Sequence, residues 1–183
     1  RMWDGMTLPN VIALLRRGRL RVAPGRLHRV CFLVLAGVLN SSLAVLQRIV
    51  YGRRIAATPL EAPPLIVIGH WRTGTTLLHE LLILDERPCF PNYYECMEPN
   101  RFLLTEKLVT RWLHFLMPSR RPMDNMKAGW DRPQEDEFAL CMMGQPSPYR
   151  TVAFPNHAPA DPEYLDLETV TGSARSAWKR TLV

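Results

Sequence analysis

The sequence predicts an α/β protein in which helices flank a parallel sheet, with a basic helical extension at the N-terminal end. The central observation is the stretch LIVIGHWRTGTTLLHELL, residues 65–82. Its first four residues, Leu65 to Ile68, follow two prolines and form an apolar, β-branched run that is typical of a buried strand. A glycine-bounded loop and an amphipathic helix beginning near Thr75 come directly afterwards. Strand, loop and helix in this order favour a parallel sheet, of which one or two strands are expected here.

The loop has the glycine spacing of a phosphate-binding loop, G-x-x-x-x-G-K-[ST], with Thr75 in place of the lysine. Glycines let the backbone approach a ligand closely, and the first N–H groups of a helix attract an anion. A positive charge and three hydroxyl donors lie in or beside the loop, on Arg72, Thr73, Thr75 and Thr76. We therefore predict a P-loop-like site for phosphate or sulfate, with local packing as the alternative role of the turn.

The net charge of +6 is concentrated at the N-terminal end. Residues 1–60 hold ten arginines and one acid, Asp4, whereas residues 61–183 hold 13 basic and 16 acidic residues. Such an asymmetry indicates contact with an anionic surface, either membrane headgroups or an acidic polymer. We divide the chain into a basic helical extension, residues 1–60, that is associated with a membrane, and a second portion, residues 61–183.

The extension contains a long apolar helix candidate at residues 27–50. No charge lies among the 18 residues between Arg29 and Arg48, which is close to the shortest length that spans a bilayer. The polar run at residues 40–42 interrupts its middle. A buried helix, a helix on a membrane surface and a true span stay open, and the missing small-residue cleavage site argues against a signal peptide. We expect a cytoplasmic protein that is peripheral to a membrane or anchored at it.

Further elements are expected downstream of the loop. A second short strand should end near Tyr94, and helices should cover residues 101–117 and 134–143. Another helix should start at Asp161 and run towards Val183. The side chains expected in the core include an apolar stripe on each of two helices, namely Leu77, Leu78, Leu81 and Leu82, and Leu104, Leu108, Trp112 and Phe115. The four cysteines show no C-x-x-C spacing, so we expect no metal site.

The loop closely resembles the 5′-phosphosulfate loop of sulfotransferases that use 3′-phosphoadenosine 5′-phosphosulfate (PAPS). It is most similar to the bacterial branch related to tyrosylprotein and glycan sulfotransferases. The family pattern, Arg or Lys, Ser or Thr, Gly, Thr, Thr, falls here on Arg72, Thr73, Gly74, Thr75 and Thr76. The segment RRPMDNMKAGWDRPQEDEFALCMMGQPSPY, residues 120–149, also resembles this branch, so the likeness runs from about Leu27 to the C-terminus.

The resemblance implies an incomplete sulfotransferase fold and a sulfuryl transfer from PAPS to a hydroxyl or amine of an unidentified small molecule, glycan or peptide. It implies no metal, and we expect no nucleic-acid partner. The donor site would comprise His70, Trp71, Arg72, Thr73, Gly74, Thr75 and Thr76, with Arg72 also acting in catalysis. Family members carry a Lys-Ser-Pro segment and an Arg…Ser pair for the 3′-phosphate that are not found after the loop here. We therefore expect these 183 residues alone to bind PAPS weakly, without useful turnover.

A general base must take the acceptor's proton, and two carboxylates are candidates. Glu95 follows Thr76 by 19 positions, which resembles the place of the catalytic glutamate in glycan and tyrosylprotein sulfotransferases. The alternative for Glu95 is a solvated loop acid. Glu137, in the run of acids at residues 135–137, is the second candidate, although acids in the first turn of a helix also stabilise its dipole.

Two rival functions stay open. A P-loop kinase or NTPase would use the same glycine spacing, but the lysine for the β- and γ-phosphates is missing and no convincing strand ends in an Asp for Mg²⁺. Magnesium-dependent ATP binding would support this rival. A membrane-surface binding protein would use the basic helix and retain only a degenerate loop, and flotation of residues 1–60 with vesicles would support it.

Overall fold

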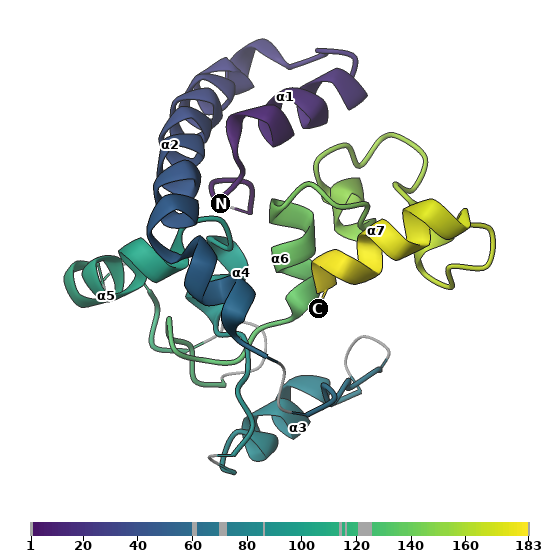
Figure 1. Cartoon of the computed structure of the whole chain (residues 1–183). Helices are drawn as coiled ribbons and strands as arrows, with labels where there is room; N and C mark the ends of the chain where they lie inside the picture. The colour runs from purple at the N-terminus through teal and green to yellow at the C-terminus, as the bar shows by residue number, and fades with distance from the viewer. Residues whose placement is uncertain are drawn as a thin grey trace.

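The computed structural model describes residues 2–59, 62–69, 73–85, 87–113, 115, 117–120 and 126–182. The α-helices formed by these residues are α1 (Leu8–Arg17), α2 (Leu27–Ala57), α3 (Thr75–Leu82), α4 (Tyr93–Met97), α5 (Phe102–Trp112), α6 (Asp136–Met142) and α7 (Gly172–Leu182). Short 3-10 helices are η1 (Pro24–Arg26), η3 (Pro148–Val152) and η4 (Pro162–Tyr164). Figure 1 shows α1 alongside the first half of the long helix α2, α6 near the centre, and α3 at the lower edge, away from the packed helices.

The main core lies between α1, the first half of α2, α6 and η3. Its buried side chains are Met6, Val11, Leu14, Cys141 and Met142. Gly37 permits the close approach of α1 to α2, because a Cβ at this position would lie 3.1 Å from the Cα of Leu8. The core includes side chains from both sides of residue 60, while the division of the chain into two portions there stays a prediction.

Asn40 turns a polar side chain of α2 into the protein. It is 1% exposed, and its amide nitrogen donates to the carbonyl of Asp4 at 2.7 Å and to that of Met6 at 3.0 Å. Buried polar groups are stable only when they are hydrogen-bonded, and Asn40 satisfies two backbone carbonyls of the segment before α1. The polar run that interrupts the apolar sequence of α2 therefore attaches the segment before α1 to this helix.

Ser41 and Gln47 attach two further helix ends to α2. The hydroxyl of Ser41 accepts a hydrogen bond of 2.9 Å from the N–H of Leu8, the first residue of α1. The side-chain oxygen of Gln47 accepts one of 2.9 Å from the N–H of Leu103, in the first turn of α5. Each bond supplies a partner to an N–H group that has none within its own helix. The inner face of α2 thus holds α1 and α5 in place.

Helix α2 has the length and composition of a membrane span, and it is the one helix of this kind in the part of the chain that the structure describes. Its most apolar window of 18 residues has a mean hydropathy of 2.0, and 17% of that window is buried. Core helices of soluble proteins and signal sequences share these properties. Length and composition alone therefore do not choose among the alternatives left open by the sequence.

The predicted strand at Leu65 to Ile68 is not assigned to regular structure, and Ile68 is 91% exposed. The β-type pairing of the described residues consists of two isolated bridges, Asn92 with Pro133 and Arg120 with Lys127. A β-branched run becomes a strand only when it packs and pairs with a neighbouring strand. The described residues contain no such partner for it, so the α/β fold class stays a prediction.

The second predicted strand, ending near Tyr94, is wrong, because these residues begin helix α4. The side chain of Asn92 accepts from the N–H of Glu95 at 2.9 Å, and the Glu95 carboxylate accepts from the N–H of Asn92 at 2.8 Å. This reciprocal pair is a capping box, which starts a helix. Its Asn-x-x-Glu signal stands in the sequence and outweighs the β-propensity of the two tyrosines.

Two further expectations about packing are wrong. Most of the stripe on α5 is exposed, with Leu108 at 62% and Trp112 at 66%, since α5 turns its other face to α4. There the hydroxyl of Tyr94 donates to Thr105 at 2.9 Å. The stripe on α3 is exposed as well, with Leu77 and Leu81 each at 56%.

The helix expected from Asp161 towards Val183 is divided into η4 and α7. Between them Leu167 adopts a left-handed backbone conformation, with φ at 63°. A leucine in that conformation cannot continue a right-handed helix. Asp161 itself has a φ of 49° and ion-pairs with Arg17 at 2.5 Å and with Arg150 at 3.3 Å.

Replacing Asn40 by alanine should lower the free energy of unfolding by about 1–3 kcal/mol, because two buried carbonyls lose their donor. Urea unfolding followed by circular dichroism measures the change. Ser42→Ala is the matched control, since this exposed residue of the same helix should change stability by less than about 0.5 kcal/mol. Equal effects of the two substitutions would contradict the role given to Asn40.

Candidate functional site

The loop before α3 is described from Thr73 onwards, and the predicted donor-site residues His70, Trp71 and Arg72 lie outside the described residues. Gly74 is the N-cap of α3 and has a φ of 89°, a left-handed conformation that glycine adopts without steric cost. Thr75 and Thr76 follow in the first turn, where backbone N–H groups have no partner within the helix. The arrangement at Thr73 to Thr76 is suited to an anion.

Gly69 closes the base of the loop. A Cβ at this position would lie 2.4 Å from Cγ2 of Thr75 and 3.0 Å from Oγ1 of Thr73, so a larger residue would displace the threonines. The two glycines therefore have different functions. Gly69 permits a close approach across the loop, and Gly74 permits the turn into the helix.

An ion pair joins α3 to the rest of the protein. Nη1 of Arg132 lies 3.3 Å from Oε2 of Glu80, which is in the second half of α3. The carbonyl of Arg132 accepts from the N–H of Tyr93 at 2.8 Å, at the start of α4. The loop-bearing helix is thus linked to the helix that carries Glu95. The sequence analysis missed this pair, because opposite charges separated by 52 positions give no pairing signal.

Glu95 is half-buried, and its carboxylate is fixed in the capping box described above. Burial raises the pKa of Glu95, the hydrogen bond from the backbone of Asn92 opposes this, and the charge of Glu106 raises it further. The amide of Asn92 also donates to Oε1 of Glu106 at 2.7 Å. Glu95 is therefore no freely solvated loop acid: it starts a helix and is coupled to a second carboxylate.

Glu137 lies in the first turn of α6. Burial raises the pKa of its carboxyl, against the opposing effect of the Ser147 hydroxyl. Its atom Oε1 is buried, and none of the described residues offers it a hydrogen-bond partner. A half-buried carboxylate with an unbonded oxygen is a reasonable proton acceptor, so Glu137 stays a candidate base beside Glu95.

Acidic side chains gather around the buried thiol of Cys96, between α4 and α6. Burial and these charges raise the pKa of the thiol to about 12, the charges being those of Asp136, Glu95 and Glu135. Glu137 instead acts on Cys141, whose pKa burial raises to about 11. The charges of Asp136 and Glu135 also raise the pKa of Glu137, so the acids at residues 135–137 act on one another as well as on these thiols.

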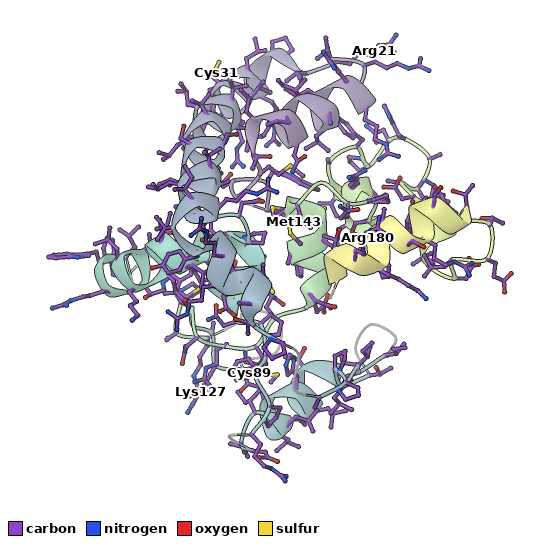
Figure 2. The ribbon with its side chains drawn as sticks, viewed as in Figure 1. Arg21, Cys31, Cys89, Lys127, Met143 and Arg180 are labelled. Carbon is purple, nitrogen blue, oxygen red and sulfur yellow. The ribbon has the colours of Figure 1, made fainter. Side chains whose placement is uncertain are left out.

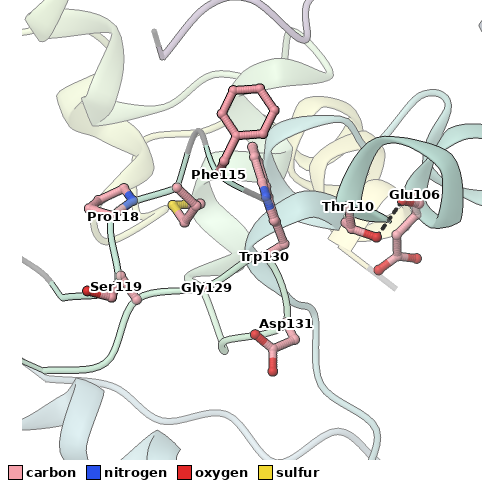
Figure 3. Close-up of a pocket in the computed structure, with 10 residues that line it drawn as sticks. Glu106, Thr110, Phe115, Pro118, Ser119, Gly129, Trp130 and Asp131 are labelled. Atoms are coloured by element: carbon pink, nitrogen blue, oxygen red, sulfur yellow. Dashed lines mark hydrogen bonds between the residues drawn. The ribbon is translucent and has the colours of Figure 1, made fainter. Parts of the chain in front are cut away.

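A cleft of about 590 Å³ lies between the end of α5 and residues 115, 117–119 and 128–131. Figure 3 shows the rings of Phe115 and Trp130 together at one wall, with Thr110 and Glu106 on the helix beyond. The ring of Trp130 also packs edge-on against Tyr94, with centroids 5.8 Å apart. The cleft is connected to Glu95 through Glu106 and Asn92. This pocket was not expected from the sequence, in which no motif links the residues that line it.

Two curated proteins, from Mycobacterium bovis and Mycobacterium tuberculosis, are each 48% identical to this chain over 181 residues. Both bear the name omega-hydroxy-beta-dihydromenaquinone-9 sulfotransferase Stf3. The chain is thus similar in sequence to proteins that are named as sulfotransferases. The aligned region covers 99% of this chain and 46% of each relative, so the chain spans about half the length of the curated relatives that it matches. No family profile and no solved structure matches it.

The structure brings Thr73 to Thr76 together with Gly69 at the start of α3. It places Glu95 and Glu137 on helices that pack against each other, α4 and α6. The ion pair of Glu80 with Arg132 is one described connection between these two parts. Among the described residues, no three His, Cys, Asp or Glu side chains are placed to hold a metal ion.

Replacing Glu137 by glutamine should make the protein more stable at pH 7, and the gain should shrink as the pH falls towards 4. A carboxyl whose pKa is raised in the folded state binds more protons there than in the unfolded state, so its contribution to stability falls as pH rises through that window. Urea midpoints at the two pH values measure this. The control is Glu163→Gln on exposed η4, and an equal gain at both pH values would contradict the assignment.

Proposed function

We propose that the protein transfers a sulfuryl group from PAPS to a hydroxyl of an apolar, isoprenoid-type acceptor. One observation carries the proposal: a glycine-closed loop heads α3 in a sequence that is 48% identical to named sulfotransferases. The name of those relatives specifies an omega-hydroxylated menaquinone as their acceptor. We extend this to the present chain as the class of hydroxylated isoprenoid quinones.

PAPS, the donor, supplies the sulfuryl group and a phosphate leaving group. Backbone N–H groups at Thr75 and Thr76 would hold the donor's anionic oxygens, since they lie at the start of a helix. The proposal adds the charge of Arg72, which the sequence places in the same loop. Sulfuryl transfer resembles phosphoryl transfer, in which donors of this kind stabilise the charge that develops on the equatorial oxygens.

We assign the general base to Glu95, with Glu137 as the alternative. The Glu95 carboxylate is held at 2.8 Å from the N–H of Asn92, so its position is fixed before an acceptor arrives. Burial raises its pKa, which makes it a better proton acceptor than a solvated glutamate. The base would remove the proton of the acceptor hydroxyl as that oxygen forms its bond to sulfur.

The cleft beside α5 is our proposed acceptor site. Phe115, Met117 and Trp130 give it apolar walls, and the carboxylate of Glu106 lies at its edge. Small-molecule sites combine such walls with a few placed polar groups. The side chain of Asn92 donates to Glu106 and accepts from the backbone N–H of Glu95, so it connects this cleft to the residue that carries the proposed base.

Gly69→Ala should weaken PAPS binding by at least about tenfold, equivalent to about 1.4 kcal/mol, because the new methyl group pushes Thr75 and Thr73 apart. Calorimetric titration of the whole protein with PAPS measures the affinity. Gly25→Ala is the control, since a Cβ there meets nothing within 4 Å. Equal affinities for all three proteins would contradict the loop assignment. Tight binding of ATP with Mg²⁺ but not of PAPS would favour the kinase alternative.

Glu95→Gln should lower kcat of the whole protein by about two to four orders of magnitude, measured as transfer to a hydroxylated isoprenoid quinone. Glutamine also completes a capping box, so the helix should stay folded while the proton acceptor is lost. Glu163→Gln on exposed η4 is the matched control. A loss confined to Glu137→Gln would move the base to α6, and a loss in neither variant would remove the carboxylate base from the mechanism.

A further inference from the structure

Helix α2 presents an apolar face to the outside of the protein. Between residues 32 and 50 eight of its large apolar side chains are 47–73% exposed, among them Phe32, Leu35, Leu39, Val45, Leu46 and Ile49. Ser42 lies on the same face, and its hydroxyl donates to the carbonyl of Val38 at 3.1 Å within the helix. A hydroxyl bonded in this way tolerates hydrocarbon, because its donor needs no water.

The polarity of α2 is the reverse of that of a water-facing surface helix. Its most buried residues are Gly37, Asn40 and Gln47, two of which are polar. Leu33 and Val34 pack against the core, but most of its large apolar residues face outwards. A surface helix in water turns apolar residues inwards and polar residues outwards. The reversed pattern indicates that the outer face of α2 meets an apolar medium.

The contacts of the inner face exclude a span surrounded by lipid. Asn40 and Ser41 attach the segment before α1 and the start of α1 itself. A span through the bilayer would carry α1 into the hydrocarbon with the exposed Arg16 and Arg17 at its end. Each charge in the hydrocarbon core costs several kcal/mol. A helix with lipid on one side and protein on the other is compatible with an orientation in the membrane plane.

Positive charge lies at both ends of this face. Arg26 and Arg29 precede it, and Arg48, Arg53 and Arg54 lie at its far end, all of them exposed. Residues 5–60 contain no acidic side chain. Figure 2 shows Cys31 on the side of α2 turned away from α1, and Arg21 extending away from the protein. Arginines near a surface of anionic lipids are attracted to it by about 1 kcal/mol each.

We propose that α2 lies in the plane of an anionic membrane, with its outer face among the acyl chains and its inner face on the protein. The apolar stretch between Arg29 and Arg48 is then about 27 Å long at 1.5 Å per residue, and it lies along the surface. The arginines contact the headgroups at its two ends. This inference does not rest on the proposed catalytic function.

Flotation of the whole protein with vesicles tests the proposal. The protein should bind vesicles of phosphatidylcholine with phosphatidylglycerol at least about tenfold more tightly than vesicles of phosphatidylcholine alone. Leu35→Gln combined with Ile49→Gln should reduce the binding by at least about tenfold, because two side chains leave the acyl region. The matched control is Leu84→Gln with Leu165→Gln. These leucines are 76% and 74% exposed, against 71% and 73% for Leu35 and Ile49. They lie outside α2, because Leu84 follows α3 and Leu165 follows η4.

Fluorophores on single exposed cysteines distinguish the two orientations, using lipid-borne quenchers in a Cys89→Ser background, to which Cys31→Ser is added for the variant with a probe at position 42. A probe on Cys31 and one on Ser42→Cys should be quenched at the same shallow depth. A much deeper probe at position 42 would show a span and overturn the proposal. Equal binding of the two double variants would overturn it as well. The proposal would also be overturned if the protein did not bind vesicles and instead formed a dimer that Leu35→Gln with Ile49→Gln dissociates. A second copy of the chain would then cover the outer face of α2.

Discussion

The arrangement of the protein depends on the hydrogen bonds made by the inner face of α2. Asn40, Ser41 and Gln47 supply partners to backbone groups at the segment before α1, the start of α1 and the start of α5. These groups would otherwise be unsatisfied, which is unfavourable wherever water is excluded. Three polar side chains of one helix therefore set the places of two others, and the apolar core between α1, α2 and α6 fills the space that results.

The same contacts explain why sequence patterns predicted the existence of α2 but not its orientation. An apolar run without charges from residue 30 to residue 47 predicts a helix, and α2 extends from Leu27 to Ala57. Which side faces the protein depends on partners that are distant in the sequence. The bond of Gln47 to Leu103 crosses 56 positions, and no local pattern reports it. The polar residues looked like an interruption because their partners could not be seen.

The candidate site was predicted unevenly, for reasons that are also physical. The glycine spacing indicated the turn at Gly74 and the helix after it, because both follow from local backbone preferences. The capping box at Asn92 was equally local, yet the tyrosines inside it drew the interpretation towards a strand. The pair of Glu80 with Arg132 unites distant segments, and the cleft beside α5 unites residues that no motif links, so only the folded chain shows them. The segment at Leu65 to Ile68 has a clear strand pattern in the sequence, but the described residues offer it no partner strand.

Glu95 unites local folding with the proposed chemistry. Its carboxylate starts α4 through Asn92 and is also the proposed proton acceptor. A residue with two such functions can change to glutamine without loss of the helix, but not to an apolar residue. The capping interaction also keeps the carboxylate from rotating, so that structural and catalytic requirements act on the same rotamer.

The connection of α3 to the rest of the protein has a consequence for ionic conditions. Arg132 and Glu80 have side chains that are 33% and 20% exposed, and pairs of this kind are weakened by dissolved salt. The leucines on the outer side of α3 add little to its attachment, because they are exposed. Added salt should therefore loosen the placement of the loop relative to α4. This effect is separate from the direct screening of a bound anion by salt.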